Sequence, residues 1–400
     1  MRLSGKYDLK SDPICQADYQ IKPCSFVDYE GWSLPVSGPF TLAKAERGTA
    51  VLYVSSPGET PLDYTAKPHS LHWSEQRFEL PSSAKRINAG EIVIWEPGYL
   101  TTQTIDNICV DKIRDNYPVV SAYEEYTQLI LDAVNRRLVT CPQANRVAVA
   151  QSGGLDSLLI VWALHTLGVK VYPLTVCTSP NDLDITAATA CLQRWGLKPI
   201  SIVVENSQAE ELLKEAITCL EDTETSNLRM AIGNLLMAKK CQELGVQSIF
   251  TGHGHDDIHG KGTLVKAALK QIKGKTESER WAIARKNVTL ATGGMLKMFA
   301  STFRSYGIHV RHPYYDRDLL NWAFSQPVSI IPATFDKSFV RDFATTILPS
   351  GEWLNKKHSV GYLTGAGLNL KQPLLKKNPL FTPELIRRFL LEIKGSIAHD

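Results

Sequence analysis

The sequence lacks several features that would assign it to common classes. No apolar run approaches the about 18 residues that a membrane helix needs, and residues 1–7 lack the apolar core of a secretory signal. It also lacks a charge excess, since 44 basic residues stand against 41 acidic ones for a formal net charge of +3. No global field therefore favours nucleic acid or an anionic membrane. These absences predict a cytoplasmic protein with neither partner.

The cysteines show no pattern of a metal or disulfide framework. There are 8 cysteines, scattered along the chain without a CxxC pair. Such spacing is typical of buried thiols in a reducing compartment. Apolar residues make up 44% of the 400 residues and charged residues 21%, a balance that predicts a folded globular chain with room for two domains.

The character of the sequence changes near residue 120. Residues 1–120 combine Pro and Gly turns with short alternating segments such as 49–54 and 91–95, which predict a smaller β-rich N-terminal domain. Residues 121–400 begin with a helical pattern over 123–138 and then alternate apolar runs with helical patterns. The predicted strands are 146–151, 169–176, 200–204 and 246–251, and the predicted helices are 157–167, 184–195 and two within 209–243. This alternation predicts an α/β fold with a parallel sheet and flanking helices, which binds ligands beyond the carboxyl ends of its strands.

A glycine-rich loop follows the first of these strands. Residues 152–157 read Ser-Gly-Gly-Leu-Asp-Ser and open a helix, whose N–H groups favour an anion. The paired glycines let a phosphate approach the backbone, and Ser152 and Ser157 add hydroxyl donors. Asp156 would repel a phosphate unless a divalent cation lay between them, so we infer Mg²⁺. The alternative is a glycine turn in which Asp and Ser cap the helix.

Further motifs occur downstream in a fixed order. Residues 251–260 read Thr-Gly-His-Gly-His-Asp-Asp-Ile-His-Gly, residues 312–320 read His-Pro-Tyr-Tyr-Asp-Arg-Asp-Leu-Leu, and Asn-Lys-Lys at 355–357 precedes three spaced glycines. Together with the first loop, this series resembles the class B asparagine synthetases, which are N-type ATP pyrophosphatases with a PP-loop. The His-Pro-Tyr opening is most similar to their β-lactam synthetase branch.

The resemblance implies a fold, cofactors and site residues. The fold would be adenine nucleotide alpha hydrolase-like, and the cofactors would be ATP and Mg²⁺. ATP would contact Ala150, Ser152, Gly153, Gly154, Asp156, Ser157, Val176, Thr251 and Gly252. Asp156 and Asp256 would bind Mg²⁺, and Lys357 would steady pyrophosphate. Lys356 stays an alternative to Lys357, because the spacing to the later glycines differs from that of relatives.

The chain departs from this family pattern at two positions. Family members with a working glutaminase carry Cys after Met1, whereas this chain has Arg2, so the N-terminal domain is interpreted as a degenerate glutaminase-like remnant. Position 253 is Glu in asparagine synthetases and Tyr, paired with a downstream Glu, in the β-lactam branch. Here it is His253, and residues 294–298 contain no carboxylate. Histidine can accept a proton near neutral pH, or it can merely close the loop by hydrogen bonds.

These features predict an ATP-dependent carbon-nitrogen ligase. It would adenylate the carboxylate of a small amino acid-like substrate, release pyrophosphate and join the acyl group to an amine, as in a β-lactam synthetase-like ring closure. The alternatives are an ammonia-dependent asparagine synthetase, a lasso-type macrolactam cyclase and a nucleotide-binding scaffold. His253, His255, Asp257 and His259 also resemble the His-x-His-x-Asp-His motif of binuclear zinc hydrolases. The oligomeric state is left open.

Overall fold

The structure is a computed structural model, and it describes most of the chain between residues 41 and 348. The described residues are 4–8, 14–17, 26–29, 32–35, 41–46, 48–55, 62–74, 80–81, 83–105, 114, 117–177, 183–204, 208–220, 225–259, 274–276, 278–279, 295–327, 329–331, 337–348, 388–389 and 391–392. The chain divides into two compact units, each built from separate stretches. The first unit is Met1–Ala144, His253–Lys297 and Arg311–Pro349, and the second unit is Asn145–Gly252, Met298–Val310 and Ser350–Asp400.

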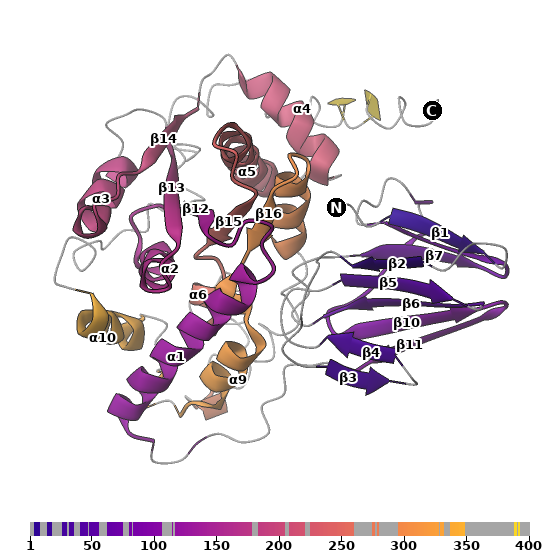
Figure 1. The fold of residues 1–400 in the computed structure, drawn as a ribbon, viewed down its shortest axis with the longest axis horizontal. Coiled ribbons are helices and arrows are strands. Elements are labelled where there is room, and N and C mark those ends of the chain that lie inside the picture. The colour runs from indigo at the N-terminus through magenta and orange to yellow at the C-terminus, as the bar shows by residue number, and fades with distance from the viewer. Residues whose placement is uncertain are drawn as a thin grey trace. The chain divides into compact units, whose positions relative to one another are not determined.

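Antiparallel strands make up the N-terminal region. A five-stranded sheet has the order β11-β10-β6-β5-β2, a four-stranded sheet has the order β1-β8-β7-β9, and β3 pairs with β4 (Figure 1). The strands are β1 (Ser4–Asp8), β2 (Ile14–Ala17), β3 (Phe26–Tyr29), β4 (Trp32–Pro35), β5 (Thr41–Glu46), β6 (Thr49–Val54), β7 (Asp63–Lys67), β8 (Ser70–Ser74), β9 (Lys85–Arg86), β10 (Glu91–Glu96) and β11 (Tyr99–Thr104). The two larger sheets make this region a β-rich layer structure, as the sequence predicts.

One apolar core joins the two larger sheets. Leu52 of β6 and Trp95 of β10 belong to the same buried cluster as Tyr64 of β7 and Trp73 of β8. The indole N–H of Trp95 donates to the carbonyl oxygen of Lys67 at 3.0 Å, which adds a polar link between the sheets. Side chains that alternate along each strand therefore fill the space between two sheets, as in a β-sandwich.

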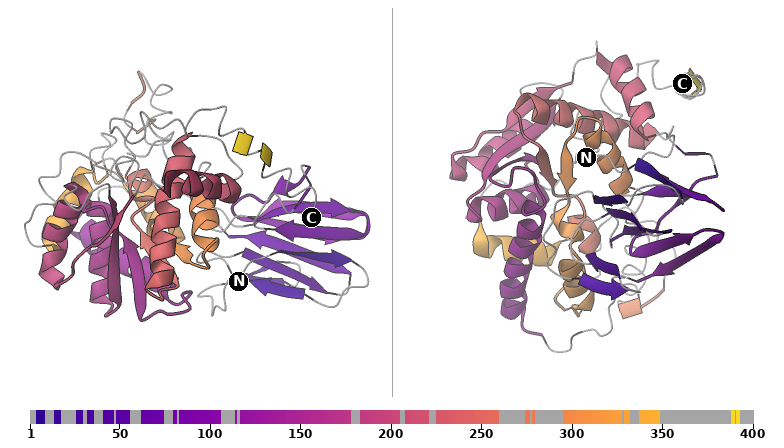
Figure 2. Two further views of the ribbon diagram at one scale, coloured as in Figure 1. Left: turned by 90° about the horizontal axis from the view of Figure 1, so that it is seen from above. Right: turned by 45° about the vertical axis from the view of Figure 1, so that its right-hand side comes forward.

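The second unit is built on a five-stranded sheet of order β14-β13-β12-β15-β16. Its strands are β12 (Arg146–Ala150), β13 (Lys170–Cys177), β14 (Ile200–Val203), β15 (Ser248–Thr251) and β16 (His309–Arg311). Strand β12 pairs in parallel with β13 and β15, and β13 pairs in parallel with β14. The crossover helices are α2 (Leu155–Thr166), α3 (Leu183–Leu192), α4 (Ala209–Leu220) and α5 (Thr225–Glu243). Helices α2, α3 and α5 all pack on β13, and Figure 2 shows these helices around the sheet from two further directions.

The predicted α/β alternation is confirmed, because each predicted strand and helix between residues 146 and 251 is present within a few residues of its expected bounds. Continuous apolar runs such as Val147–Val149 are fully buried, which is the signal of a central parallel strand. Strand β16 was not predicted. Its three residues are too few to show a period, and two of them are His309 and Arg311.

Further described helices lie in the first unit. Among them are α1 (Val119–Leu138), α6 (His255–Ile258), α9 (Arg317–Ser325), α10 (Ser338–Ile347) and a short 3-10 helix, η5 (Pro313–Tyr315). Helix α1 packs against both α9 and η5. Its buried residues Ala122, Tyr126, Ile130 and Ala133 recur at helical spacing. Among the described helices, none is long and apolar enough to cross a membrane.

Candidate functional site

The carboxyl end of the parallel sheet brings several predicted ATP contacts together in the second unit. Ala150, the last residue of β12, lies between Leu174 of β13 and Thr251 of β15. Val176 lies two residues further along β13, and it is buried. The chain then leaves β12 through residues 151–154 and enters α2 at Leu155. The first loop therefore starts at the sheet edge where α/β folds bind their ligands.

The side chain of Gln151 hydrogen-bonds to two residues of the first loop. Its side-chain oxygen accepts hydrogen bonds from the backbone N–H of Gly153 at 3.1 Å and from the hydroxyl of Ser157. The hydroxyl of Thr175 in β13 donates to the Gln151 carbonyl oxygen at 2.7 Å. The sequence analysis did not single out Gln151. A polar residue directly after a buried apolar strand was the signal that could have identified it.

Two glycines are required by close backbone approach. Gly153 has φ +71°, and a Cβ there would lie 2.6 Å from the Cβ of Ala187 in α3. A Cβ on Gly252 would lie 2.7 Å from the backbone nitrogen of Ser157 and 2.8 Å from the carbonyl carbon of Asp156. The residue after β15 thus packs directly on the first turn of α2, and a larger residue would push the two backbones apart.

The start of α2 has the donors that a phosphate chain requires. The N-cap is Gly154, and no side chain of the described residues caps this helix end. The first intrahelical bond runs from the N–H of Leu158 to Gly154, so the N–H groups of the preceding turn have no acceptor within the helix. The buried side-chain nitrogen of Gln151 also has no hydrogen-bond partner among the described residues. The described residues show no Asp or Ser cap on the first turn of α2, although the hydroxyl of Ser152 accepts the N–H of Gly154 at 3.4 Å. The remaining N–H donors suit an anion.

The second loop, residues 251–260, continues into the first unit at His253, and the structure describes it as far as His259. Helix α6 places Asp256 and Asp257 in different surroundings. Asp256 is half exposed, and its Oδ1 lies 2.7 Å from Nζ of Lys337. Asp257 is buried, and its Oδ2 accepts the hydroxyl proton of Tyr315 at 2.5 Å. Two adjacent carboxylates therefore face solvent and protein, respectively.

Burial controls the two most perturbed groups around this loop. Burial, together with the charge of Asp256, raises the pKa of Asp257 to about 6, against the opposing effects of the Tyr315 hydrogen bond and Lys337. Burial also holds the pKa of His312 well below its usual value, and the nearby His253 lowers it further. His312 is therefore neutral at physiological pH, and its ring lies edge-on to that of His253, with centroids 5.7 Å apart.

The other two histidines of the loop form part of the core. Nε2 of His255 and Nε2 of His259 lie 2.6 Å and 2.8 Å from the hydroxyl oxygen of Tyr126. His255 also stacks on Tyr314, with ring centroids 4.0 Å apart. All four side chains are buried. Since both imidazole Nε2 atoms are engaged by one hydroxyl group, this arrangement does not resemble a binuclear zinc centre, and over the described residues no group of three metal-ligating side chains gathers.

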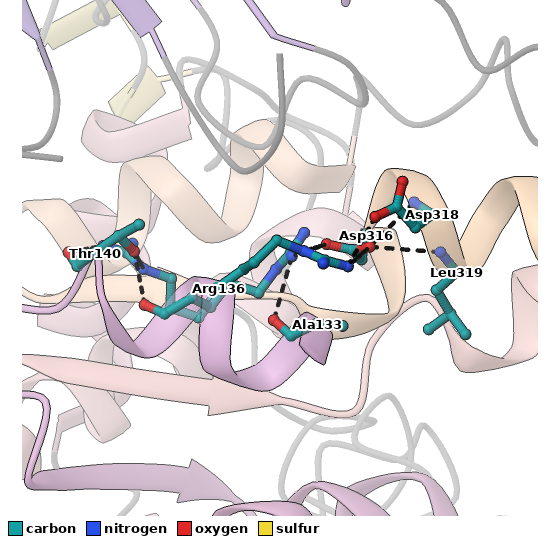
Figure 3. Close-up of polar contacts among 8 residues, drawn as sticks. Ala133, Arg136, Thr140, Asp316, Asp318 and Leu319 are labelled. Carbon is teal, nitrogen blue, oxygen red and sulfur yellow. Dashed lines mark hydrogen bonds and ion pairs between the residues drawn. The ribbon is translucent and has the colours of Figure 1, made fainter. Parts of the chain in front are cut away.

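The segment that carries Tyr315 is fixed by a buried ion pair. Asp316 accepts hydrogen bonds from Arg136 at 2.9 Å and from Arg137 at 2.7 Å, both from the last turn of α1 (Figure 3). It also caps α9 by accepting the N–H groups of Asp318 and Leu319. Burial raises the pKa of Asp316, but the charges of Arg137 and Arg136 outweigh burial and hold it below its usual value. This carboxylate joins α1, η5 and α9.

The two carboxylates that the sequence predicts as magnesium ligands are each accessible within their own unit. Asp156, in the first turn of α2, is partly exposed, and Asp256 is half exposed. Mg²⁺ in nucleotide sites usually takes one or two carboxylates and completes its shell with water and substrate phosphates, so a cluster of three side chains is not required. Lys356 and Lys357 lie outside the described residues.

Comparison with known proteins gives a family match and distant relatives. Residues 125–304 match the family model of asparagine synthase. The glutamine-hydrolyzing asparagine synthetase of Homo sapiens is 25% identical over 224 residues, which are 54% of this chain and 38% of that protein. A glutamine-hydrolyzing asparagine synthetase of Lotus japonicus is 26% identical over 203 residues, or 48% of this chain and 33% of that protein.

A solved structure, the U34-tRNA thiolase NcsA from Methanococcus maripaludis with its 4Fe-4S cluster, is 12% identical. The likeness covers 72% of this chain and 82% of that one, and its TM-score of 0.28 is too low to support an argument. The chain spans between a third and two fifths of the length of the curated relatives named above. Residues 125–304 are thus similar to the asparagine synthase family model, and about half of the chain is similar to distant asparagine synthetases.

Proposed function

We propose that this protein is an ATP-dependent amide-forming ligase, which adenylates a substrate carboxylate, releases pyrophosphate and joins the acyl group to an amine. The asparagine synthase domain and the synthetase relatives support a ligase-type enzyme. The single observation that carries the proposal is the first loop, where the described residues provide neither a side-chain cap for α2 nor a hydrogen-bond partner for the Gln151 side-chain nitrogen. The proposed fold is that of the PP-loop proteins.

In the first step the substrate carboxylate would attack the α-phosphate of ATP. The N–H groups at the start of α2 and the hydroxyls of Ser152 and Ser157 would hold the departing pyrophosphate by charge-directed hydrogen bonds. A magnesium ion bound by Asp156 and Asp256 would neutralise charge on the phosphates. We assign the stabilising cation of the late loop to Lys357, with Lys356 as the alternative, on the basis of the resemblance to the family.

In the second step an amine would attack the acyl-adenylate, and AMP would leave. His253 is the base that we assign to the amine's proton. The finer proposal is that the amine belongs to the same small amino acid-like substrate, so that the product is a lactam. The resemblance of residues 312–314 to the β-lactam synthetase branch supports it, as does a second loop in which His253 replaces the acidic residue of asparagine synthetases.

Isotope exchange tests the ligase proposal. Labelled pyrophosphate should enter ATP only when the right carboxylic acid from a panel of amino acids and diamino acids is present. Asp156→Asn should abolish exchange because the metal and phosphates lose their carboxylate, whereas Asp132→Asn on α1 should not affect it. Full exchange in the Asp156 variant would contradict the assignment of the metal.

Product mass separates ring closure from use of ammonia. Ring closure predicts a product lighter than the substrate by one water and free of label from isotopically labelled ammonium. Incorporation of that label would instead show an ammonia-dependent asparagine synthetase type of reaction, and the lactam proposal would be abandoned.

A further inference from the structure

The side-chain nitrogen of Gln151 is a buried hydrogen-bond donor that the loop itself does not use. Gln151 is 2% exposed, and its Nε2 has no hydrogen-bond partner among the described residues. A buried donor without an acceptor destabilises a protein, because it has lost its hydrogen bonds to water and has formed none in their place. An apolar side chain of similar size would fill this position without that cost, so the amide requires another explanation.

The orientation of the amide follows from the contacts of its oxygen. Oε1 of Gln151 accepts the N–H of Gly153 at 3.1 Å and the hydroxyl proton of Ser157. A flipped amide would turn its NH₂ group toward the N–H of Gly153, so that two donors would face each other. The donor without a partner is therefore Nε2, and it lies beside the point on which the donors of Gly153 and Ser157 converge.

The backbone on both sides of this amide is fixed. The N–H of Gln151 donates to the carbonyl oxygen of Leu174 at 2.8 Å, and the carbonyl oxygen of Gln151 accepts the hydroxyl proton of Thr175 at 2.7 Å. Gly153 has φ +71° and lies so close to Ala187 that no Cβ would fit between them. The position of Nε2 is therefore set by the strand end and the loop, and Nε2 is not the tip of a mobile side chain.

The surroundings of Nε2 favour an anionic acceptor. Ser157 belongs to the first turn of α2, a 12-residue helix whose start attracts negative charge. The hydroxyl proton of Ser157 is already directed to Gln151, whereas Nε2 can donate without breaking an existing hydrogen bond. A buried donor also binds a charged acceptor more strongly than an exposed donor does, because water does not compete for it.

We infer that Gln151 is a further phosphate-binding residue, whose Oε1 arranges Gly153 and Ser157 and whose Nε2 donates a hydrogen bond to the phosphate chain of the nucleotide. This inference rests on the proposed function, because it adds a residue to the site that would hold ATP and the departing pyrophosphate. Gln151 lies outside the Ser-Gly-Gly-Leu-Asp-Ser motif of residues 152–157, which carries the resemblance to the PP-loop.

Isothermal titration calorimetry of the full chain tests this role. ATP or inorganic pyrophosphate is titrated in the presence of Mg²⁺ and without a carboxylic acid, so that the ligase reaction cannot proceed. Gln151→Leu removes the amide at nearly constant volume, and we expect the Kd of both ligands to rise about tenfold to a hundredfold. Adenosine, which lacks phosphates, should bind equally well to the variant and the wild type. An unchanged Kd for pyrophosphate would overturn the inference.

A second variant separates phosphate binding from support of the loop. Gln151→Glu keeps an oxygen that can accept from Gly153 and Ser157, but an ionised carboxylate has no proton to donate to a phosphate. We expect it to weaken pyrophosphate binding more than Gln151→Leu does, because it also adds a negative charge. If Gln151→Glu bound pyrophosphate as tightly as the wild type, Gln151 would only support the loop and the inference would be wrong.

Ser248→Ala is the matched control for these variants. The hydroxyl oxygen of Ser248 is also buried, and it has no hydrogen-bond partner among the described residues. Ser248 begins β15, whereas the predicted ATP contact Thr251 ends that strand. Its replacement should leave the Kd of pyrophosphate unchanged. A loss of affinity equal to that of Gln151→Leu would show that the effect does not depend on the first loop, and it would contradict the inference.

Binding and isotope exchange together separate the inference from the proposed function. If the Gln151 variants weaken ATP binding as expected but no acid supports pyrophosphate exchange in the wild type, the phosphate contact stands and the ligase proposal fails. If exchange occurs in the wild type and Gln151→Leu binds ATP and pyrophosphate with wild-type affinity, the ligase proposal stands and the inference fails. Wild-type protein that binds neither ATP nor pyrophosphate would contradict both.

Discussion

Replacing the three glycines around the first loop by alanine, one at a time, should give a graded loss of stability. The grading follows from what a Cβ would meet at each position. At Gly154 it would meet only the hydroxyl of Ser152, at 3.2 Å, and that side chain can rotate away. At Gly252 it would meet the backbone of α2 at 2.7 Å. At Gly153 it would meet α3 at 2.6 Å and also occupy a positive φ.

The magnitudes can be estimated from these two kinds of strain. Overpacking against backbone costs about 1–3 kcal/mol, which we assign to Gly252→Ala. Gly153→Ala adds about 1–2 kcal/mol for a left-handed backbone, and so about 2–5 kcal/mol in total. Gly154→Ala should stay within about 1 kcal/mol, because a weaker N-cap is offset by a less flexible unfolded chain.

Thermal unfolding followed by circular dichroism measures this order. Each kcal/mol should lower the midpoint by about 2–4 °C in a unit of this size. Gly168→Ala is a useful control, because Gly168 has φ +73° but a Cβ there would meet nothing within 4 Å, so it isolates the backbone cost. A Gly252→Ala midpoint as high as that of Gly154→Ala would show that β15 and α2 do not approach as described.

Three further predictions concern other parts of the chain. Asp316→Asn should cost about 3–5 kcal/mol at neutral pH, because it leaves buried Arg137 without its counter-ion. The pKa of Asp316 is lowered by folding, so this stabilisation is present above the unfolded pKa of about 3.9, and acid titration should show it lost as pH falls through the lower folded pKa. Tyr126→Phe should cost about 1–3 kcal/mol in urea unfolding, since two buried imidazoles lose their hydroxyl partner. Lys337→Met should tighten binding of Mn²⁺, measured by electron paramagnetic resonance, if Lys337 competes with the metal for Asp256.

Each of these variants has a control variant of the same residue type. Asp318→Asn changes a carboxylate that is more than half exposed, so it should cost less than about 1 kcal/mol. Tyr123→Phe removes a hydroxyl group from the same helix as Tyr126, and the ring at position 123 keeps its contact with Phe339. Lys240→Met removes an exposed pair with Glu243 and should not affect Mn²⁺ binding. If a control variant changes the measured quantity as much as its test variant does, the structural reason given for that test variant is wrong.

The sequence was sufficient for the parallel sheet because its strands are short apolar runs between helical patterns. Val147–Val149 and the strand ending at Thr251 are buried on both faces, which leaves a signal that needs no tertiary information. The first loop was equally clear, because the glycines and the helix start are adjacent in sequence. Features that depend only on near neighbours were therefore predictable.

The polar contacts that support the site were not predictable. Asp316 and Arg136 are 180 positions apart, and Tyr315 and Asp257 are 58 apart, so no local pattern connects them. The sequence leaves His253 either as a base or as a histidine that closes the loop, and residues 294–298, where the β-lactam branch would carry its Glu, contain no carboxylate. The carboxylate of Asp257 is four positions further along the same loop and accepts the hydroxyl proton of Tyr315, a contact that only the packed structure shows.

The products of ATP turnover test the central claim most directly. The protein is incubated with ATP, Mg²⁺ and the carboxylic acid that supports exchange, and the nucleotide and phosphate products are separated by chromatography. Adenylation predicts AMP and pyrophosphate in equal amounts, formed only when the acid is present. Formation of ADP and inorganic phosphate instead would contradict the account, because the first loop would then hold a nucleotide that is cleaved at a different bond.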